Sequence, residues 1–437
     1  MLFVILLFPL LFLACGEAEL IVHDEEPELK YNYWLLKAYF YHPERIKDYE
    51  EYRGMEIDSM YESLKDYFCG ANYTGHCGAR YTRYYPPEKS DDKISDIENT
   101  KKYYSFGFEI SDESVDTLIV SAVYPISPAF SAGLKKQDRL LSANGIPLTG
   151  EKAAAYLKND DKFEDSTVFV VLRGKDTFPL LAMRKAEVQK PTVYLDSLEG
   201  IPYIRVTEYK VNTNNPKGTH AEFKEILQEI KEAKSAIMDL RYNPGGNIWH
   251  CTAMAAELVP LDRELVYDVQ HRYDNKRGNV IDISHDFARD YLKQEGAGVN
   301  IKWVILINGG SASCSERFTA AVKYNRRETV VIGQTSFGKG IGQVYTKTYL
   351  GGLAYITSLQ TFYPNGTTFH NVGIKPNIPA ESKDIYDKAI KAAQGLSLAK
   401  RSSTFIHSKT LPPERLAENM EPGAYRRIEM PLFHQWE

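Results

Sequence analysis

Residues 303–316 read WVILINGGSASCSE, an apolar run followed at once by a glycine-rich turn with three serines. WVILI carries no charge, which predicts a strand buried on both faces of a sheet. The same arrangement occurs twice more, where SAIMDL runs into RYNPGGN and TVVIG runs into QTSFGKG. Strands alternate with helical stretches over residues 190–385, which favours a mixed α/β sheet. Because sites in such sheets lie at the carboxyl ends of strands, we expect the three turns to converge.

The composition is that of an ordinary globular protein. The chain has 437 residues, of which 43% are hydrophobic and 25% charged. This length allows roughly two to four domains, and this much apolar surface excludes a fully disordered chain. A net charge of −5 argues against a nucleic-acid binder that relies on phosphate neutralisation. The 5 cysteines are too few for a disulfide scaffold.

Residues 1–14 are almost wholly apolar and end at Cys15. The run is shorter than the roughly 20 residues that span a bilayer, and it is typical of a signal peptide. The sequence Leu13-Ala14-Cys15-Gly16 resembles the lipobox of bacterial lipoproteins, although no Lys or Arg precedes the apolar run. The resemblance implies lipidation of Cys15 and export to the cell envelope, on the periplasmic or extracellular face. A buried core helix or a mistaken start site is the alternative.

Residues 15–100 are interpreted as a helical N-terminal region and linker. WLLKAYF and SMYESLKDYF carry apolar residues at helical spacing, and YYPPEKSDD breaks that pattern as a linker would. We expect this region to act as packing or scaffold rather than in catalysis. Cys69 and Cys77 lie close together in it and could form a disulfide in an oxidising compartment. A zinc site with His76 would need a second ligand pair that the spacing does not offer, so we expect no metal.

Residues 101–188 change to short β-rich runs bounded by Gly, Pro and Asn. The order of AGL, DRLL and NG within residues 127–148 resembles a PDZ domain. Phe106, Gly107 and Phe108 resemble the carboxylate-binding loop of that family. The resemblance implies that backbone N–H groups face the C-terminal carboxylate of a peptide, which adds a strand to the sheet edge. A generic small β-domain is the alternative.

The turn at residues 308–316 presents three hydroxyls and a thiol at the start of a predicted helix. A helix N-terminus stabilises negative charge and therefore suits both a nucleophile and an oxyanion. Ser313, with Glu316 three residues later, also has the form of a capping box, so a plain N-cap is the alternative. Cys251 follows another glycine-rich turn and receives no role.

Residues 333–340, GQTSFGKG, nearly match a phosphate-binding loop. Gly340 stands where Ser or Thr would hold magnesium, and the segment after it reads as a strand instead of a helix, so nucleotide binding is disfavoured. Lys339 is better interpreted as a lysine delivered into a site. A serine needs an adjacent base, and a lysine serves only when neutral, which requires burial to lower its pKa toward roughly 7–8. The turns together suggest a Ser–Lys dyad, while a Ser–His triad through His250 or His370 stays open.

The order DLRYNPGG, GSASCSE and FGKGxxQ resembles the C-terminal processing, or tail-specific, serine peptidases. The likeness covers about residues 100–380, including the PDZ-like domain. It implies a ClpP/crotonase-like core in which Ser313 is the nucleophile, Lys339 the base and Gln343 the group that orients the lysine. It also implies an oxyanion hole of backbone N–H groups at Gly245 or Gly246 and at Cys314.

Two positions depart from the family pattern. Cys314 replaces the usual alanine, and a thiol at a helix N-terminus should have a lowered pKa and could react. Asn377 stands where the family usually has aspartate, with no catalytic consequence that the sequence reveals.

The sequence therefore predicts an exported, lipid-anchored serine endopeptidase with five segments. These are the signal peptide (1–14), the helical region and linker (15–100), the PDZ-like domain (101–188), the peptidase core (189–395) and a C-terminal tail (396–437). Its partners would be protein or peptide substrates, with their C-terminal tails as a candidate recognition element, and a membrane through the anchor, with no nucleic acid and no cofactor. A cysteine hydrolase that uses Cys314 and a non-catalytic PDZ-type peptide-binding lipoprotein are the alternatives.

Overall fold

The computed structural model describes residues 25–69, 77–110, 118–149, 164–179, 183–274, 276–381 and 383–395. The expected signal peptide, Cys15 and the tail from residue 396 lie outside these ranges. Within them, every helix is too short or too polar to cross a membrane.

The central sheet is mixed, as the alternation of strands and helices predicts. Its order is β12-β13-β14-β17-β18-β21, and the last five strands run parallel while β12 pairs antiparallel with β13. The strands are β12 (Val193–Leu198), β13 (Ile201–Val206), β14 (Ser235–Asp239), β17 (Lys302–Ile307), β18 (Val330–Gly333) and β21 (Ile378–Pro379).

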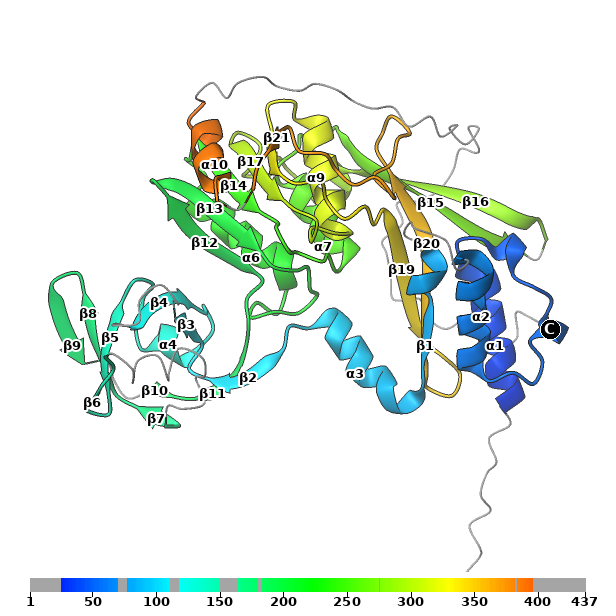
Figure 1. The fold of residues 1–437 in the computed structure, drawn as a ribbon, viewed down its shortest axis with the longest axis horizontal. Coiled ribbons are helices and arrows are strands. Elements are labelled where there is room, and N and C mark those ends of the chain that lie inside the picture. The colour runs from blue at the N-terminus through cyan, green and yellow to red at the C-terminus, as the bar shows by residue number, and fades with distance from the viewer. Residues whose placement is uncertain are drawn as a thin grey trace, which may run out of the picture.

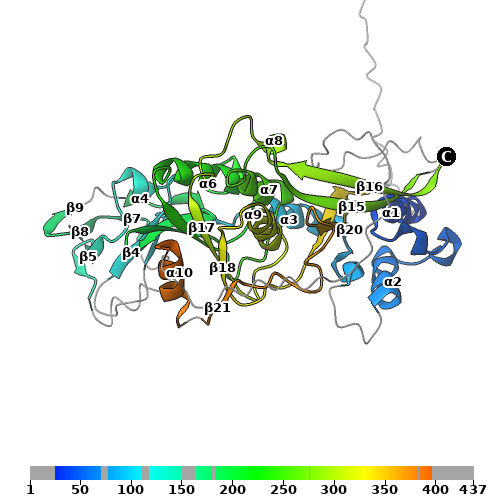
Figure 2. The ribbon, with the colours of Figure 1, turned by 90° about the horizontal axis from the view of Figure 1, so that it is seen from above.

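Helices cover both faces of this sheet (Figures 1 and 2). Met238 and Ile305 face α6 (Gly218–Glu229), α7 (Ile248–Ala256) and α9 (Cys314–Asn325). Their strand neighbours Ile237 and Val304 face the opposite way, toward α10 (Ile385–Ala393). Because side chains alternate along a strand, only strands that are apolar on both faces can fill this position, which explains the charge-free stretches 236–238 of β14 and 303–307 of β17.

A second, antiparallel sheet joins the core to the N-terminal region. It has the order β1-β20-β15-β16, with β19 also paired to β20. The strands are β1 (Arg83–Tyr85), β15 (Glu264–Asp274), β16 (Gly278–Phe287), β19 (Ile341–Lys347) and β20 (Leu353–Phe362). The expected helices are present as α1 (Glu25–Tyr39) and α2 (Ile57–Cys69), and the cluster that they form includes Ala354 and Ile356 of β20.

The expected linker at residues 84–92 is wrong. Tyr84 and Tyr85 belong to β1, which pairs with β20, and the two prolines begin helix α3 (Pro87–Glu98). Proline is suited to the first turn of a helix because the missing N–H would have no partner there. The proline pair therefore begins a helix where the pattern suggested a break. Between α2 and β1 lies the short 3-10 helix η3 (Gly78–Tyr81).

Residues 108–179 contain a small antiparallel sheet of order β3-β4-β5-β8-β9, with β6 paired to β5. Its elements are β3 (Phe108–Ile110), β4 (Leu118–Val123), α4 (Pro128–Ser131), β5 (Arg139–Ala143), β6 (Ile146–Pro147), β8 (Phe169–Arg173) and β9 (Asp176–Pro179), with a further two-stranded pair of β7 (Ser166–Thr167) and β10 (Met183–Arg184). The ladder of β2 (Lys102–Ser105) and β11 (Ala186–Gln189) leads into and out of this β-domain (Figure 1).

Candidate active site

Three turns meet at the carboxyl ends of β14, β17 and β18. A Cβ atom on Gly245, whose φ is +103°, would lie 2.8 Å from Ser313 Cβ and 2.9 Å from the Cys314 nitrogen, so the first turn touches the second. Phe337 N donates to Ser311 O at 3.0 Å, so the third turn also touches the second. The predicted convergence is confirmed, because neighbouring parallel strands end at one edge of the sheet.

Ser313 sits between β17 and α9 in an unusual backbone conformation. Its φ is 55° and its ψ is −113°, in the left-handed half of conformational space that side chains rarely adopt. Its carbonyl accepts the first helical hydrogen bonds, from Glu316 N and Arg317 N, while its side chain makes no capping hydrogen bond within the described residues. The plain N-cap is therefore only half formed, and Oγ is left for another use. Strained backbone of this kind persists where surrounding contacts enforce it, often at functional sites.

Glu316 holds the serine turn and the lysine turn together. Its Oε2 accepts hydrogen bonds from Ser313 N at 2.9 Å and from Lys339 N at 2.7 Å. Its Oε1 accepts from Gly338 N at 2.6 Å and from Ser336 Oγ at 2.5 Å. Burial raises the pKa of the Glu316 carboxyl, and these four donors act in the opposite direction. The sequence suggested only half of this role, through the capping-box spacing.

Lys339 is prepared to lose its proton. Burial lowers the pKa of its ammonium group to about 8, although the Glu316 carboxylate acts in the opposite direction. Its Nζ donates to Gln343 Oε1 at 2.9 Å, which is the contact that the family resemblance implies. A lysine with a pKa near the working pH can act as a general base, whereas an ordinary lysine is fully protonated. Gly340 leads directly into β19, so the helix that a phosphate-binding loop requires is missing at this point.

Two backbone N–H groups of the converging turns are available to an anionic ligand. Among the described residues, neither Gly246 N nor Cys314 N donates to a protein acceptor. Gly245 N, in contrast, donates to Asn243 Oδ1 at 2.9 Å. Of the two glycines that the resemblance offers for an oxyanion hole, Gly246 thus has the free donor, while Gly245 supplies the close approach to Ser313.

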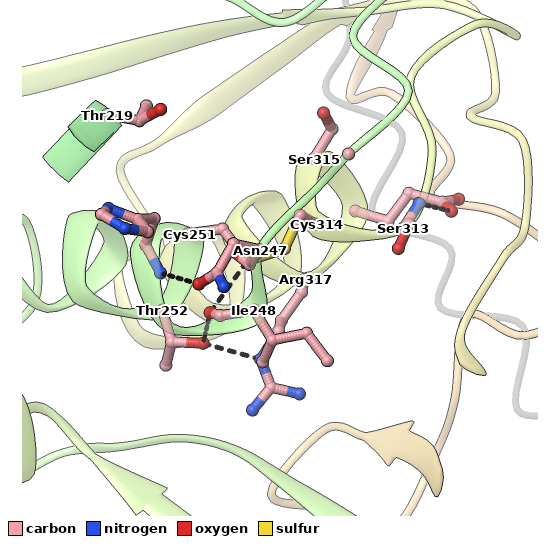
Figure 3. Close-up of a disulfide and its surroundings, with 12 residues drawn as sticks. Thr219, Asn247, Ile248, Cys251, Thr252, Ser313, Cys314, Ser315 and Arg317 are labelled. Atoms are coloured by element: carbon pink, nitrogen blue, oxygen red, sulfur yellow. Dashed lines mark hydrogen bonds between the residues drawn. A yellow bond between two sulfur atoms is a disulfide. The ribbon is translucent and has the colours of Figure 1, made fainter. Parts of the chain in front are cut away.

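Cys314 forms a disulfide with Cys251, which corrects the expectation of a reactive thiol. The bond joins the first turn of α7 to the first residue of α9, directly beside Ser313 (Figure 3). A cysteine hydrolase therefore lacks its thiolate in the oxidised protein. The pairing also gives Cys251 a role that local sequence did not reveal, because 63 residues separate the two cysteines. Cys77 is disulfide-bonded too, and the Cys69 side chain lies outside the described atoms.

Removal of the Cys251–Cys314 bond is expected to lower the free energy of unfolding. The bond closes a loop of 63 residues, for which restriction of the unfolded chain contributes roughly 4 kcal/mol. Urea unfolding of the double variant Cys251→Ala/Cys314→Ala, under oxidising conditions, measures this. The variant isolates this bond better than a reductant, which would also open the disulfide of Cys77. An unfolding midpoint equal to that of the wild type would contradict the expectation.

Neither candidate histidine is hydrogen-bonded to Ser313 in the part of the chain that the structure describes. His250 is buried, and its Nδ1 accepts from His220 N at 3.2 Å. Burial lowers the pKa of His250 to about 4, and neighbouring His220 adds to the effect. His370 lies beside Gly340, where a Cβ would meet the His370 nitrogen at 2.9 Å.

Phe106, Gly107 and Phe108 lie where β2 leads into β3. Both phenylalanine rings are buried against Phe169, in the core of the β-domain. Gly107 has a φ of 78°, and a Cβ there would lie 2.3 Å from Ser127 Cβ, so only glycine fits. Its N–H donates to Ser105 Oγ at 3.0 Å. That this loop receives a peptide carboxylate stays a prediction, and residues 150–163, which follow β6, lie outside the described ranges.

The described residues contain no cluster of side chains that could hold a metal ion. Fold and site together define an α/β protein with a strained serine at a strand-to-helix turn and a half-buried lysine on the adjoining turn. Residues 200–380 match the family model "Peptidase family S41". The chain is therefore similar to this family and to proteins named as CtpA-like or carboxy-terminal processing serine proteases.

The relatives are distant in sequence. A "Probable CtpA-like serine protease" of Staphylococcus aureus (strain COL) is 26% identical over 356 residues, which cover 80% of this chain and 64% of that protein. "Carboxy-terminal processing protease CtpB" of Bacillus subtilis (strain 168) is 28% identical over 293 residues, or 65% of this chain and 56% of that protein. A solved lipoprotein structure from Streptococcus agalactiae aligns at 14% identity and a TM-score of 0.46, covering 90% of this chain and 99% of that one. The chain thus spans a little under two thirds of the length of the curated relatives.

Proposed function

We propose that the protein is a serine endopeptidase that hydrolyses peptide bonds of protein substrates with a Ser313–Lys339 dyad. One observation carries the proposal: the turn of Lys339 and the strained turn of Ser313 are both hydrogen-bonded to the Glu316 carboxylate. The pKa of Lys339 is lowered, and its Nζ is hydrogen-bonded to Gln343. The names of the curated relatives support the same reaction class.

In this mechanism, neutral Lys339 takes the proton of Ser313 Oγ as the oxygen attacks the scissile carbonyl carbon. The oxyanion of the tetrahedral intermediate accepts hydrogen bonds from Gly246 N and Cys314 N, and each such donor contributes roughly 3–4 kcal/mol. Lys339 then protonates the departing amine, which leaves an acyl group on Ser313. A water molecule gives its proton to Lys339 and attacks the ester carbonyl carbon. As the second tetrahedral intermediate collapses, Lys339 returns this proton to Ser313 Oγ and the acid product leaves.

We further propose that residues 101–188 form a PDZ-like domain that recognises substrate tails or gates the site. The six-stranded antiparallel sheet and the glycine-only position at Gly107 support this assignment. The lipobox-like sequence that ends at Cys15 supports export and a lipid anchor in the cell envelope. The two alternatives differ from this proposal in what they require. A cysteine hydrolase requires a free Cys314 thiol, and a peptide-binding lipoprotein would bind peptides without cleaving them.

Incubation of the oxidised protein with casein tests the reaction class. We expect fragments that increase with time and whose yield is unaffected by iodoacetamide, because Cys314 is held in a disulfide. A peptide with a free C-terminal carboxylate should be cut faster than its C-terminal amide if tails are recognised. Absence of fragments would favour the non-catalytic alternative. Complete inhibition by iodoacetamide, with Cys314 alkylated, would favour the cysteine hydrolase.

A further inference from the structure

A turn of the N-terminal region lies against the lysine of the site. The turn is η3 (Gly78–Tyr81), which lies outside residues 200–380 that match the S41 model. The centroid of the Tyr81 ring is 4.5 Å from Lys339 Nζ. A ring face at this distance attracts an ammonium group and also excludes water from that side of it.

A chain of hydrogen bonds reaches the same lysine from the other end of η3. Lys339 Nζ donates to Gln343 Oε1 at 2.9 Å, and Gln343 Nε2 donates to Thr357 Oγ1 at 3.2 Å. Thr357 Oγ1 donates in turn to Gly78 O at 2.7 Å. These hydrogen bonds thus link the Lys339 ammonium group, through side chains of β19 and β20, to the backbone carbonyl of Gly78 in η3.

The direction of this chain fixes the orientation of the Gln343 amide. The single hydroxyl proton of Thr357 is directed to Gly78 O, so Oγ1 can only accept from Gln343. Gln343 must therefore turn its NH₂ group to Thr357 and its carbonyl oxygen to Lys339. A flipped amide would place NH₂ against the ammonium group and a carbonyl against an acceptor.

The turn is itself held firmly. Thr357 N donates to Thr82 Oγ1 at 3.0 Å, and Thr82 and Ala79 are fully buried. Cys77, directly before the turn, is in a disulfide. A rigid anchor of this kind is what a group needs if it is to orient a catalytic side chain.

We propose that η3 completes the lysine site, with Thr357 and Tyr81 as positioning residues that orient Gln343 and shield Lys339. The inference rests on the proposed function, in which Lys339 is the base. It assigns the N-terminal region a part in the chemistry, whereas the sequence suggested scaffold alone. Tyr81 and Thr357 carry no motif that local sequence could reveal, because their contacts arise only in the folded chain.

Thr357→Val tests the hydrogen-bond chain. Valine keeps the shape but removes the hydroxyl, so the Gln343 amide is free to flip and its oxygen no longer stabilises the protonated lysine. We expect kcat to fall roughly tenfold at every pH, and the acid limb of the kcat/KM profile to move to lower pH. Thr357→Ser restores the hydroxyl and should restore both readouts. A Thr357→Val protein with the wild-type profile and kcat would overturn this part of the proposal.

Tyr81→Ala tests the shielding, and the opposite shift is expected. Loss of the ring face removes an attraction for the ammonium group, but water that enters beside Nζ solvates this charge more strongly. The acid limb should therefore move up by about one pH unit, with a tenfold loss in kcat/KM near pH 7. Tyr81→Phe retains the ring face and should restore the limb. Tyr85→Ala is the matched control, because it removes another ring of the same region, which lies 5.5 Å from Lys93 Nζ. An unshifted limb in Tyr81→Ala would overturn the shielding role.

A measurement that needs no turnover separates this inference from the proposed function. Competitive acetylation with acetic anhydride over a pH series, read by mass spectrometry, gives the titration midpoint of Lys339 in each variant. Lys323 is the internal reference, since burial lowers its pKa to about 8 as well and it lies on α9, away from the turn of Lys339. A Lys339 midpoint that moves up in Tyr81→Ala and down in Thr357→Val, with Lys323 unmoved, supports the inference even if no substrate is cut. Equal movement of both lysines would indicate general loosening and overturn it.

Discussion

Ser313→Ala is expected to end turnover and leave a folded protein. The change removes the only atom that forms the acyl bond, and loss of a serine nucleophile lowers kcat roughly 10⁴- to 10⁶-fold in serine peptidases. The Gly246 and Cys314 donors remain, so substrate should still bind and accumulate uncut. Fragment release from casein, measured beside the wild type, checks the loss. Undiminished cleavage by the pure variant would remove Ser313 from the mechanism.

The backbone of Ser313 supplies a matched control for folding. Alanine at a φ of 55° is strained to the same degree as serine, so Ser313→Ala should unfold at the same urea concentration as the wild type. Glycine adopts this φ freely, and Ser313→Gly should gain about 1 kcal/mol in the free energy of unfolding. Both variants should be inactive. If Ser313→Ala, which is as stable as the wild type, and Ser313→Gly, which is more stable, are both inactive, unfolding cannot explain the loss of activity.

The core fold was predictable because each buried strand carries its own signature. SAIMDL, WVILI and TVVIG are apolar on both faces and end in glycine-rich turns, so their order along the chain already implies a shared edge. The hairpin of β15 and β16 was not predicted, because its residues are mixed in polarity and many of those in β16 are only half-buried. Its place depends on pairing with β20, a contact distant in sequence.

The site was predictable only where a residue type limits the chemistry. A lysine between two glycines and a serine at a helix start have few uses, and both lie at the converging turns. Glu316, Cys251 and Tyr81 are different, because a buried acid, a cysteine and a tyrosine have many ordinary places in a protein. Their roles follow from contacts with Lys339 N, Cys314 and Lys339 Nζ, which exist only in the folded chain.

Lys339→Met is expected to lower kcat roughly 10⁴-fold, because methionine fills the space of the lysine stem but cannot take a proton. Lys339→Arg should be equally inactive, since a guanidinium stays protonated at every working pH. The wild-type kcat/KM should rise about tenfold per pH unit below pH 8 and level off above it, as the ammonium group with its pKa of about 8 is deprotonated. Appreciable turnover by either variant would show that another group takes the Ser313 proton.

The same substitution should raise stability where it removes activity. The pKa of Lys339 is lower in the folded protein than in the unfolded chain, so below pH 8 the buried charge opposes folding, and this penalty disappears as the pH rises toward the ordinary lysine value. Lys339→Met is free of the penalty and should be more stable than the wild type at pH 7, by about 1–2 kcal/mol once the lost Gln343 contact is included. At pH 10 most of this advantage should be gone. Urea unfolding at pH 7 and at pH 10 measures this difference between Lys339→Met and the wild type. If the difference in the free energy of unfolding is the same at both pH values, burial does not lower the pKa of Lys339.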